Sequence, residues 1–259
     1  MGLRSSYAPG TFSWVDLATT DQADAKRFYG GLFGWEAQDM PVGDGVFYSM
    51  MSRDGHVVCA IAPQPQAQRD AGVPPVWQSY VTVESADGAA QLASAAGGNV
   101  HAGPFDVFEA GRMGVIQDPQ GAFFMVWEPR QTLGAELVNA PGALCWNELY
   151  VPDLDAAQAF YGAVFGWGFA PMEGADTPYT VISNGEHSNG GMLPPPMEGI
   201  PPHWLVYFGT EDIDAGLAAV VDLGGSVMNG PIDIGIAKLG VVADAQGATF
   251  ALYDGRFDE

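Results

Sequence analysis

One motif occurs twice in this chain of 259 residues, and the duplication constrains the fold more than any other feature. The first copy joins Trp-Val-Asp-Leu at 14–17 to Phe-Tyr-Gly-Gly-Leu-Phe-Gly-Trp at 28–35. The second copy has Trp-Asn-Glu-Leu at 146–149 and Phe-Tyr-Gly-Ala-Val-Phe-Gly-Trp at 160–167. The offset is 132 residues at both ends of the motif (146 − 14 and 167 − 35). A repeat at constant spacing predicts two halves that share one fold.

Each copy predicts a short strand followed by a helix. Alternate strand residues face opposite sides, so Trp14 and Asp16 share one face. Asp21 is the expected N-cap, because its carboxylate can accept from free amides of the first helical turn. Gly34 is the expected left-handed end of the helix. The equivalent residues of the second copy are Trp146, Glu148, Asp153 and Gly166.

The rest of each half predicts more strands and a second helix. Two strands around an Asp-Gly or Asn-Gly turn are followed by a Pro-rich connector, a strand, a helix and a closing pair of strands. The closing strands flank Asp-Pro-Gln-Gly at 118–121 or Asp-Ala-Gln-Gly at 244–247. We therefore predict an α+β protein with four βαβββ modules, whose curved mixed sheets surround cup-shaped cavities. The expected domains are 1–130 and 142–259, with a linker at 131–141.

Composition narrows the class of partner. The formal net charge of −22 disfavours nucleic acid and anionic membranes, since both repel an acidic surface. Two cysteines make no disulfide framework, and the sequence shows neither a signal peptide nor a membrane span, so we expect a cytoplasmic protein. The expected partner is a small molecule. The expected assembly is a monomer with an internal pseudo-dimer, or a weak homodimer.

The repeated motif and the Asp-Pro-Gln-Gly turn resemble the vicinal oxygen chelate superfamily, which includes glyoxalase I, bleomycin-resistance proteins and extradiol dioxygenases. More narrowly, the chain resembles two-domain actinobacterial proteins labelled hydroxylase or 27-kDa antigen. The resemblance covers nearly the whole chain and implies two tandem glyoxalase-like domains. Because this fold hosts many chemistries, its function depends on the residues in the cups.

The resemblance also implies where metal ligands stand in the metalloenzymes of the family, which place His, Gln or Glu on four cup-facing strand positions. Three of these positions can be assigned here in each half, and they hold Trp14, Gln78 and Met125, then Trp146, Leu205 and Ala251. An indole has only a donor N–H, and a single neutral amide is too weak to hold a divalent metal. We therefore expect no metal and no other cofactor.

Asp16 and Glu148 are the candidate catalytic residues, because each shares the cup-facing side of its strand with a tryptophan. A carboxylate beside an indole in an apolar cup has its charged form disfavoured, as suits a general acid or base. The alternative is a structural acid that is hydrogen-bonded to the backbone or to the other repeat.

Further cup-facing residues are candidates for ligand binding. Alternatively, the aromatic and apolar ones belong to an ordinary barrel core. The two cations, Arg112 and Lys238, either bind an anionic group of the ligand or neutralise acids such as Asp106 and Asp233. The full set is Trp14, Trp146, Gln78, Tyr80, Tyr207, Met125, Trp127, Tyr253, Arg112 and Lys238.

We interpret the chain as a metal-independent glyoxalase-fold protein that binds a small, largely apolar, oxygenated metabolite. The favoured function is a hydroxylase- or lyase-like tailoring enzyme of secondary metabolism that uses a cup carboxylate. One alternative is a non-catalytic protein that sequesters a drug or metabolite, as the bleomycin-resistance relatives do. Another is a metal-dependent glyoxalase or dioxygenase, which the missing ligands disfavour.

Overall fold

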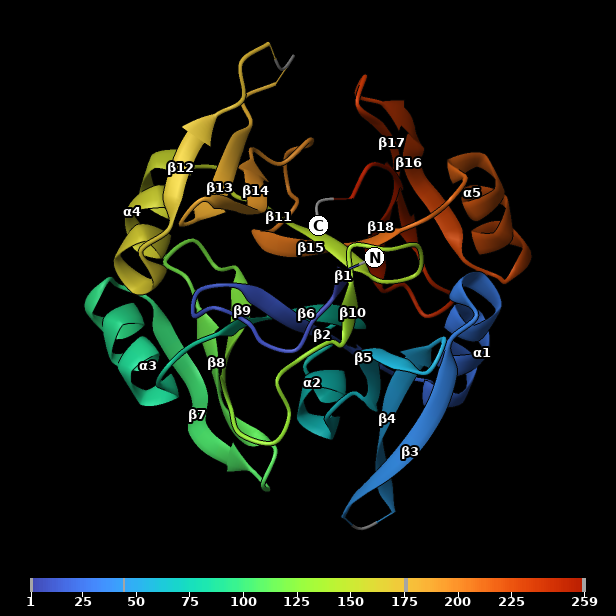
Figure 1. Cartoon of the computed structure of the whole chain (residues 1–259), viewed down its shortest axis with the longest axis horizontal. Coiled ribbons are helices and arrows are strands. Elements are labelled where there is room, and N and C mark those ends of the chain that lie inside the picture. Colours follow the sequence, from blue (N-terminus) through green and yellow to red (C-terminus); the bar gives the residue numbers. More distant parts are fainter. Residues whose placement is uncertain (1, 44, 175–176, 258–259) are drawn as a thin grey trace.

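The computed structural model describes residues 2–43, 45–174 and 177–257. Figure 1 shows two similar halves that face away from each other, with helices along both sides. The first half contains β2 (Phe12–Thr19), α1 (Gln22–Phe33), β3 (Glu36–Gly43), β4 (Val46–Arg53), β5 (His56–Pro63), α2 (Gln66–Asp70), β6 (Val76–Thr82), α3 (Ala86–Ala95), β7 (Asn99–Val107), β8 (Gly111–Gln117) and β9 (Phe123–Pro129).

The second half repeats this order without a counterpart of α2. It contains β11 (Leu144–Tyr150), α4 (Leu154–Phe165), β12 (Gly168–Pro171), β13 (Thr180–Asn184), β14 (His187–Leu193), β15 (His203–Gly209), α5 (Ile213–Asp222), β16 (Ser226–Asp233), β17 (Ala237–Ala243) and β18 (Thr249–Gly255). Outside both halves, β1 (Gly2–Leu3) pairs with β10 (Leu137–Val138). The predicted linker is therefore anchored to the N-terminal segment by a short two-stranded sheet.

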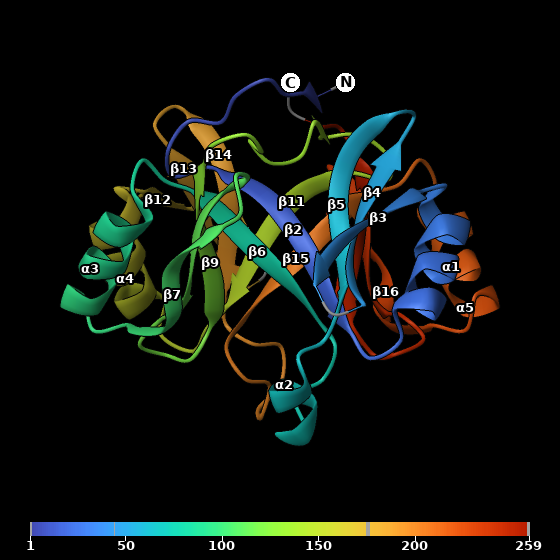
Figure 2. The ribbon, with the colours of Figure 1, turned by 90° about the horizontal axis from the view of Figure 1, so that it is seen from below.

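Each half forms one mixed sheet of eight strands. The order in the first half is β3-β4-β5-β2-β6-β9-β8-β7, and the second half has the equivalent order β12-β13-β14-β11-β15-β18-β17-β16. The two modules of a half meet where β2 pairs antiparallel with β6, or β11 with β15. In Figure 2, β2 and β6 cross between the outer strands of the first half. The α+β architecture with tandem glyoxalase-like domains is thus confirmed.

The motif that defines the repeat forms the predicted strand and helix in each half. Asp21 accepts from the amide of Asp24 at the start of α1, and Gly34 ends the helix with φ 70°. In the second half, Asp153 caps α4 and Gly166 ends it with the same φ. Glycine suits this left-handed position because it has no Cβ to clash with the backbone.

The halves pack through the sides of their sheets that face away from the cups. The Ser79 hydroxyl on β6 donates to Asn147 Oδ1 on β11 at 2.6 Å. Helix α1 packs against α5, and α3 against α4, so each helix pair combines both halves (Figure 2). One hydrophobic cluster includes residues of both halves, among them Phe33 and Phe208, whose ring centroids are 5.4 Å apart.

The turn aspartates also join the halves, a role that the sequence did not reveal. Asp118 Oδ1 accepts three backbone amides of its own turn, while Oδ2 accepts the hydroxyl of Tyr161 from the second half. The pseudo-symmetric bond runs from Tyr29 to Asp244 Oδ2 at 3.1 Å. Each aspartate therefore fixes its own turn and docks a helix of the other half.

Among the described residues, no helix is long and apolar enough to cross a membrane.

Candidate active site in two cups

A buried carboxylate lies at the centre of the first cup. Oδ2 of Asp16 accepts the hydroxyls of Tyr48 and Tyr80, both at 2.9 Å, and Oδ1 accepts the amide of Gln78 at 3.0 Å. The indole N–H of Trp14 donates to the Tyr48 hydroxyl at 3.0 Å. The pairing of β2 with β6 places Gln78 directly opposite Asp16. Asp16 is thus enclosed by donors from β4 of its own module and from β6 of the next module.

Burial shifts the proton affinity of this carboxylate. Only 4% of Asp16 is exposed, and loss of water raises its pKa to about 6. The hydrogen bonds from Tyr80, Tyr48 and Gln78 act in the opposite direction, because they stabilise the charged form. The result is an acid whose pKa lies within reach of neutral pH, where a side chain can both take and return a proton.

The second cup contains a related arrangement around Glu148. Its Oε2 accepts the hydroxyls of Tyr150, at 2.8 Å, and Tyr207. The indole of Trp146 donates to the Tyr179 hydroxyl at 3.0 Å, matching the indole–tyrosine bond of the first cup. The Tyr179 hydroxyl is a further hydrogen-bond partner of the Glu148 carboxylate. Three tyrosines therefore surround the buried acid of the second cup.

Burial likewise raises the pKa of Glu148, which is 6% exposed. Hydrogen bonds from Tyr207, Tyr150 and Tyr179 oppose the shift. Burial, followed by the charge of Glu148, raises the pKa of Tyr207 well above its usual value. The tyrosines consequently stay protonated and act as donors, while the carboxylate is the group that titrates.

The two cups differ in the source of one donor. Gln78 on β6 bonds to Asp16 in the first cup, whereas Leu205 stands at the equivalent position of the second. There the donor is Tyr150 on β11, where the first half has Ala18. The duplicated sites keep the buried acid but have changed its surroundings.

Further aromatic and apolar candidates pack in the same clusters as the residues around the two acids. Met125 and Trp127 belong to the same hydrophobic cluster as Trp14 and Tyr80, and the Trp127 indole donates to the carbonyl of Thr132 at 2.9 Å. In the second half, the cluster around the cup contains Tyr150, Leu205, Tyr207, Ala251, Trp146 and Tyr253. These residues give each cup an aromatic lining.

The two predicted cations do not face the cups. Arg112 precedes Met113, which packs against the cluster of the first cup, so alternation turns Arg112 to the other side of β8. There it pairs with Asp87 on α3 at 2.8 Å and with Asp106 at 3.0 Å. Its interpretation as a ligand-binding residue is therefore wrong, and the charge-neutralising alternative holds.

Lys238 shares this orientation. It is exposed and precedes Leu239, which packs into the second cup, so the lysine lies on the opposite side of β17. Its Cα is paired with that of Asp233. The ligand-binding interpretation of Lys238 is contradicted by the same alternation.

Three tyrosines of the site were missed from the sequence. Tyr48 and Tyr179 hold equivalent places, and their offset of 131 residues (179 − 48) differs from that of the main motif by one. The signal available in the sequence was a tyrosine at an equivalent place in each half, Tyr48 on β4 and Tyr179 directly before β13. Tyr150 had none, because its equivalent, Ala18, carries no polar group.

The donor set does not fit the divalent metal that the fold implies. The indoles of Trp14 and Trp146 offer only N–H donors, and both are bonded to tyrosine oxygens. Met125 and Ala251 supply no nitrogen or oxygen ligand. Across residues 2–43, 45–174 and 177–257, no group of three His, Cys, Asp or Glu side chains is placed to hold a metal ion. The residues at these positions therefore do not form a site for a divalent metal.

Comparison with known proteins agrees with the fold and the duplication. Residues 11–126 and 143–252 each match the Glyoxalase/Bleomycin resistance protein/Dioxygenase superfamily. The chain belongs to this superfamily and contains two tandem copies of its domain.

Relatives of similar length include the mycobacterial protein CFP32, whose name marks it as a candidate glyoxylase. The chain is 44% identical to CFP32 of Mycobacterium tuberculosis over 255 residues, which cover 97% of each chain. It is also 35% identical to the anthracycline biosynthesis protein DnrV of Streptomyces peucetius, over 96% of this chain and 94% of that protein. The homologues thus include proteins of secondary metabolism.

Solved structures share the fold at much lower identity. The Mn(II)-bound glyoxalase of Novosphingobium aromaticivorans superimposes with a TM-score of 0.66 and 18% identity, covering 97% of this chain and 85% of that one. The 2,3-dioxygenase LapB of Pseudomonas sp. KL28 gives a TM-score of 0.65 at 14% identity, over 96% of this chain and 94% of LapB. These similarities concern the fold alone.

Proposed function

We propose that the protein is a metal-independent tailoring enzyme of secondary metabolism that binds a small, largely apolar, oxygenated metabolite in a cup. The carboxylate of Asp16 or Glu148 serves as its general acid and base. The observation that carries the proposal is the buried acid of each cup, surrounded by tyrosine hydroxyls and an indole. The relatives named for anthracycline biosynthesis support the metabolic setting.

The chemistry that suits this geometry is proton transfer beside a substrate carbonyl. The carboxylate takes a proton from the neighbouring carbon, and the C–H electron pair moves toward the carbonyl oxygen. As the carboxylate takes the proton it no longer holds its tyrosine donors, and a tyrosine hydroxyl turns to the carbonyl oxygen and stabilises the charge that develops there. The carboxylic acid then returns the proton at another atom or to a leaving group. Hydroxylation would need an additional oxidant, so the proposal is the lyase-like branch.

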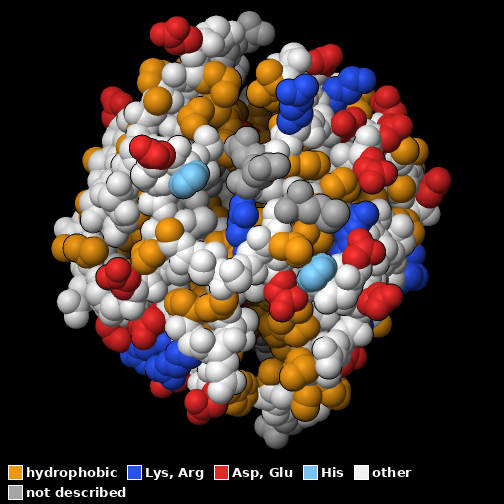
Figure 3. All heavy atoms as spheres, in the orientation of Figure 1, with side chains coloured by type: hydrophobic (Ala, Val, Ile, Leu, Met, Phe, Trp, Pro, Cys, Tyr) orange, Lys and Arg blue, Asp and Glu red, His pale blue; other side chains and the backbone are white. Residues whose placement is uncertain are grey.

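The surroundings of the cups favour an apolar ligand. Figure 3 shows hydrophobic side chains along hollows at two opposite edges of the molecule. The outer hairpins carry exposed hydrophobic residues, namely Phe47 and Phe108 in the first half and Met228 and Ile236 in the second. Acidic side chains predominate elsewhere on the visible surface, consistent with a net charge of −22. An anionic ligand would be repelled by this surface.

The test is turnover by carboxylate variants on a panel of aromatic polyketide ketones, with products followed by mass spectrometry. We expect Asp16→Asn or Glu148→Gln to lower turnover by about 10²–10⁴-fold, the usual contribution of a general acid or base. Asp233→Asn, which changes an exposed acid, is the matched control and should retain activity. Full turnover in the Asp16→Asn, Glu148→Gln double variant would refute the proposal.

A second candidate is a non-catalytic metabolite-binding protein. Asp16 favours this alternative, because both of its oxygens already accept hydrogen bonds from the protein. In that case the amide variants bind the same ligands, and neither they nor the native chain converts any compound of the panel.

A further inference from the structure

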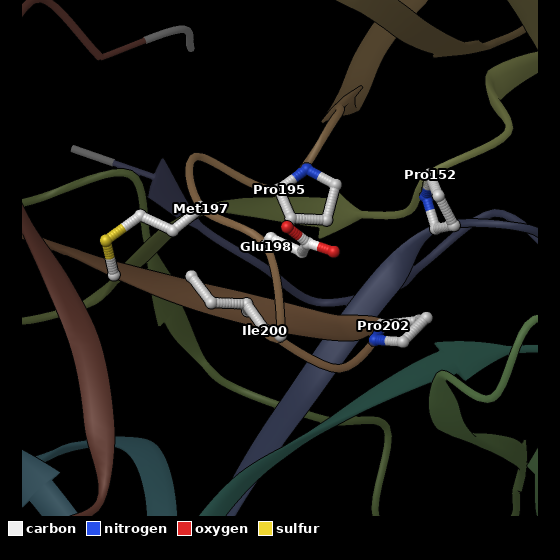
Figure 4. Close-up of a pocket in the computed structure, with 7 residues that line it drawn as sticks. Pro152, Pro195, Met197, Glu198, Ile200 and Pro202 are labelled. Atoms are coloured by element: carbon white, nitrogen blue, oxygen red, sulfur yellow. The ribbon is translucent and has the colours of Figure 1, made fainter.

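A second depression lies beyond the tyrosine end of the second cup. It has a volume of about 270 Å³ and is lined by the 194–202 connector and the end of β11. Figure 4 shows the side chains of Pro152, Pro195, Met197, Glu198, Ile200 and Pro202 around a common space. This lining consists mainly of proline and other apolar side chains. Its one charged side chain, Glu198, is negative.

Strand alternation connects the depression to the cup. Trp146, Glu148 and Tyr150 project from the cup face of β11, and Pro152 is the next position in that row. On the neighbouring strand β14, Leu193 packs into the cup cluster, and Pro195 follows it in the same alternation. The depression therefore lies next to the ends of β11 and β14, two residues beyond Tyr150 and Leu193.

A stacked ring pair lies beside the buried acid of the second cup. The ring of His203 lies over that of Tyr150, with centroids 5.1 Å apart and an interplanar angle of 13°. His203 is held by its Nδ1 contact to the carbonyl of Pro201, at 2.8 Å. The Tyr150 hydroxyl donates to Glu148. Tyr150 thus contacts the buried acid with its hydroxyl, while Pro202, which directly precedes His203, lines the depression.

The connector of the first half is held differently. The residue equivalent to Pro195 is Gln64, as the pairing of Asp16 with Ala60 and of Glu148 with Gly191 establishes an offset of 131. Gln64 is buried, and its amide donates to the carbonyls of Val73 and Pro74. These hydrogen bonds join the two ends of the first connector, on either side of α2. Proline cannot make these bonds, and the second connector is consequently free to border a pocket.

We propose that the depression is an outer subsite of the second cup, which holds the neutral, apolar ring system of an elongated ligand whose oxygenated end reaches Glu148. Glu148 and Pro152 are four residues apart, which is about 13 Å in an extended chain. This distance exceeds the width of a single aromatic ring, so a ligand that reaches both residues must be elongated. The proposal rests on the function proposed above and assigns it to the second cup. Glu198 and the net charge exclude an anionic ring system from this subsite.

The test compares two neutral probes with the same para-dihydroxy pattern, hydroquinone with one ring and quinizarin with three fused rings. Binding is followed by quenching of tryptophan fluorescence, since Trp146 lines the cup. We expect Met197→Asp and Ile200→Asp each to weaken quinizarin binding at least about tenfold and to leave hydroquinone binding within about twofold. Met197 is 67% exposed, so its substitution should not disturb folding. Met197→Leu should bind both probes normally.

Val73→Asp is the matched control, because Val73 is an exposed apolar residue of the first connector. It should leave the binding of both probes unchanged. Equal losses for both probes in Met197→Asp, no loss for either probe, or a loss only in Val73→Asp would each overturn the outer subsite.

The subsite and the acid–base function can fail separately. Selective loss of quinizarin binding together with normal turnover in Glu148→Gln would retain the subsite and refute catalysis by Glu148. Loss of turnover in Glu148→Gln, together with unchanged probe selectivity in Met197→Asp, would retain catalysis by Glu148 and refute the subsite.

Discussion

Replacing Asp16 with asparagine should make the stability of the protein less dependent on pH. The pKa of Asp16 is raised to about 6 in the fold, from 3.8 as its usual value. Because the native state binds the proton more tightly than the unfolded chain, this group favours folding below its unfolded pKa. That contribution is lost as the pH rises through the folded pKa. Asparagine keeps the shape of the side chain but cannot ionise.

The magnitude follows from the two pKa values. With 3.8 for the unfolded chain and about 6 for the native one, the native chain should lose about 1.3 kcal/mol between about pH 5 and pH 7 through this group alone. The difference in unfolding free energy between Asp16→Asn and the native chain should therefore increase by that amount over this interval. Other buried acids, including Glu148, contribute equally to both proteins and cancel in the difference.

Urea denaturation followed by fluorescence at several pH values measures this difference. The Asp233→Asn variant, which changes an exposed acid, is measured alongside as the matched control. A constant difference for Asp16→Asn would show that Asp16 is not the raised acid, and would weaken its assignment as a base.

Three further outcomes follow from the structure. Tyr161→Phe and Tyr29→Phe should each lower the unfolding free energy by about 1 kcal/mol or somewhat more in denaturant titrations, because each leaves an aspartate oxygen without its donor from the other half. Residues 1–135 alone should form a dimer or aggregate in size-exclusion chromatography, since α1 loses aromatic partners such as Phe250; a stable monomer with sharp spectra would contradict this. Metal analysis of protein purified without chelators should find no stoichiometric Mn, Ni, Zn or Fe, and one tightly held ion per chain would overturn our account of the cups.

The sequence was informative where the physical constraint is local or repeated. The strand pattern placed Trp14 and Asp16 on one face, and the capping residues Asp21 and Gly34 marked the ends of α1. The offset of 132 residues then identified the equivalent residues of the motif in the second half. These elements could be predicted because their geometry depends on nearby residues alone.

The sequence failed where side chains meet through docking or across loops. Tyr150 donates to Glu148 from two positions further along the same strand, β11, but its first-half equivalent, Ala18, gives no sign of such a bond. The role of Asp118 in joining the halves depends on where α4 lies, which a turn motif does not specify. Arg112 was placed on the wrong side because the phase of β8 could not be fixed from the sequence.

The contact between α1 and the last strand has a consequence for synthesis on the ribosome. Phe28 packs edge-on against Phe250, which is translated 222 residues later (250 − 28). Asp244, which accepts the Tyr29 hydroxyl, is translated 215 residues after it (244 − 29). Until these residues have been translated, the aromatic side chains of α1 in the nascent first half lack the residues that bury them in the native fold. An exposed apolar surface of this kind promotes chaperone binding or premature association. β18 thus completes the core around α1.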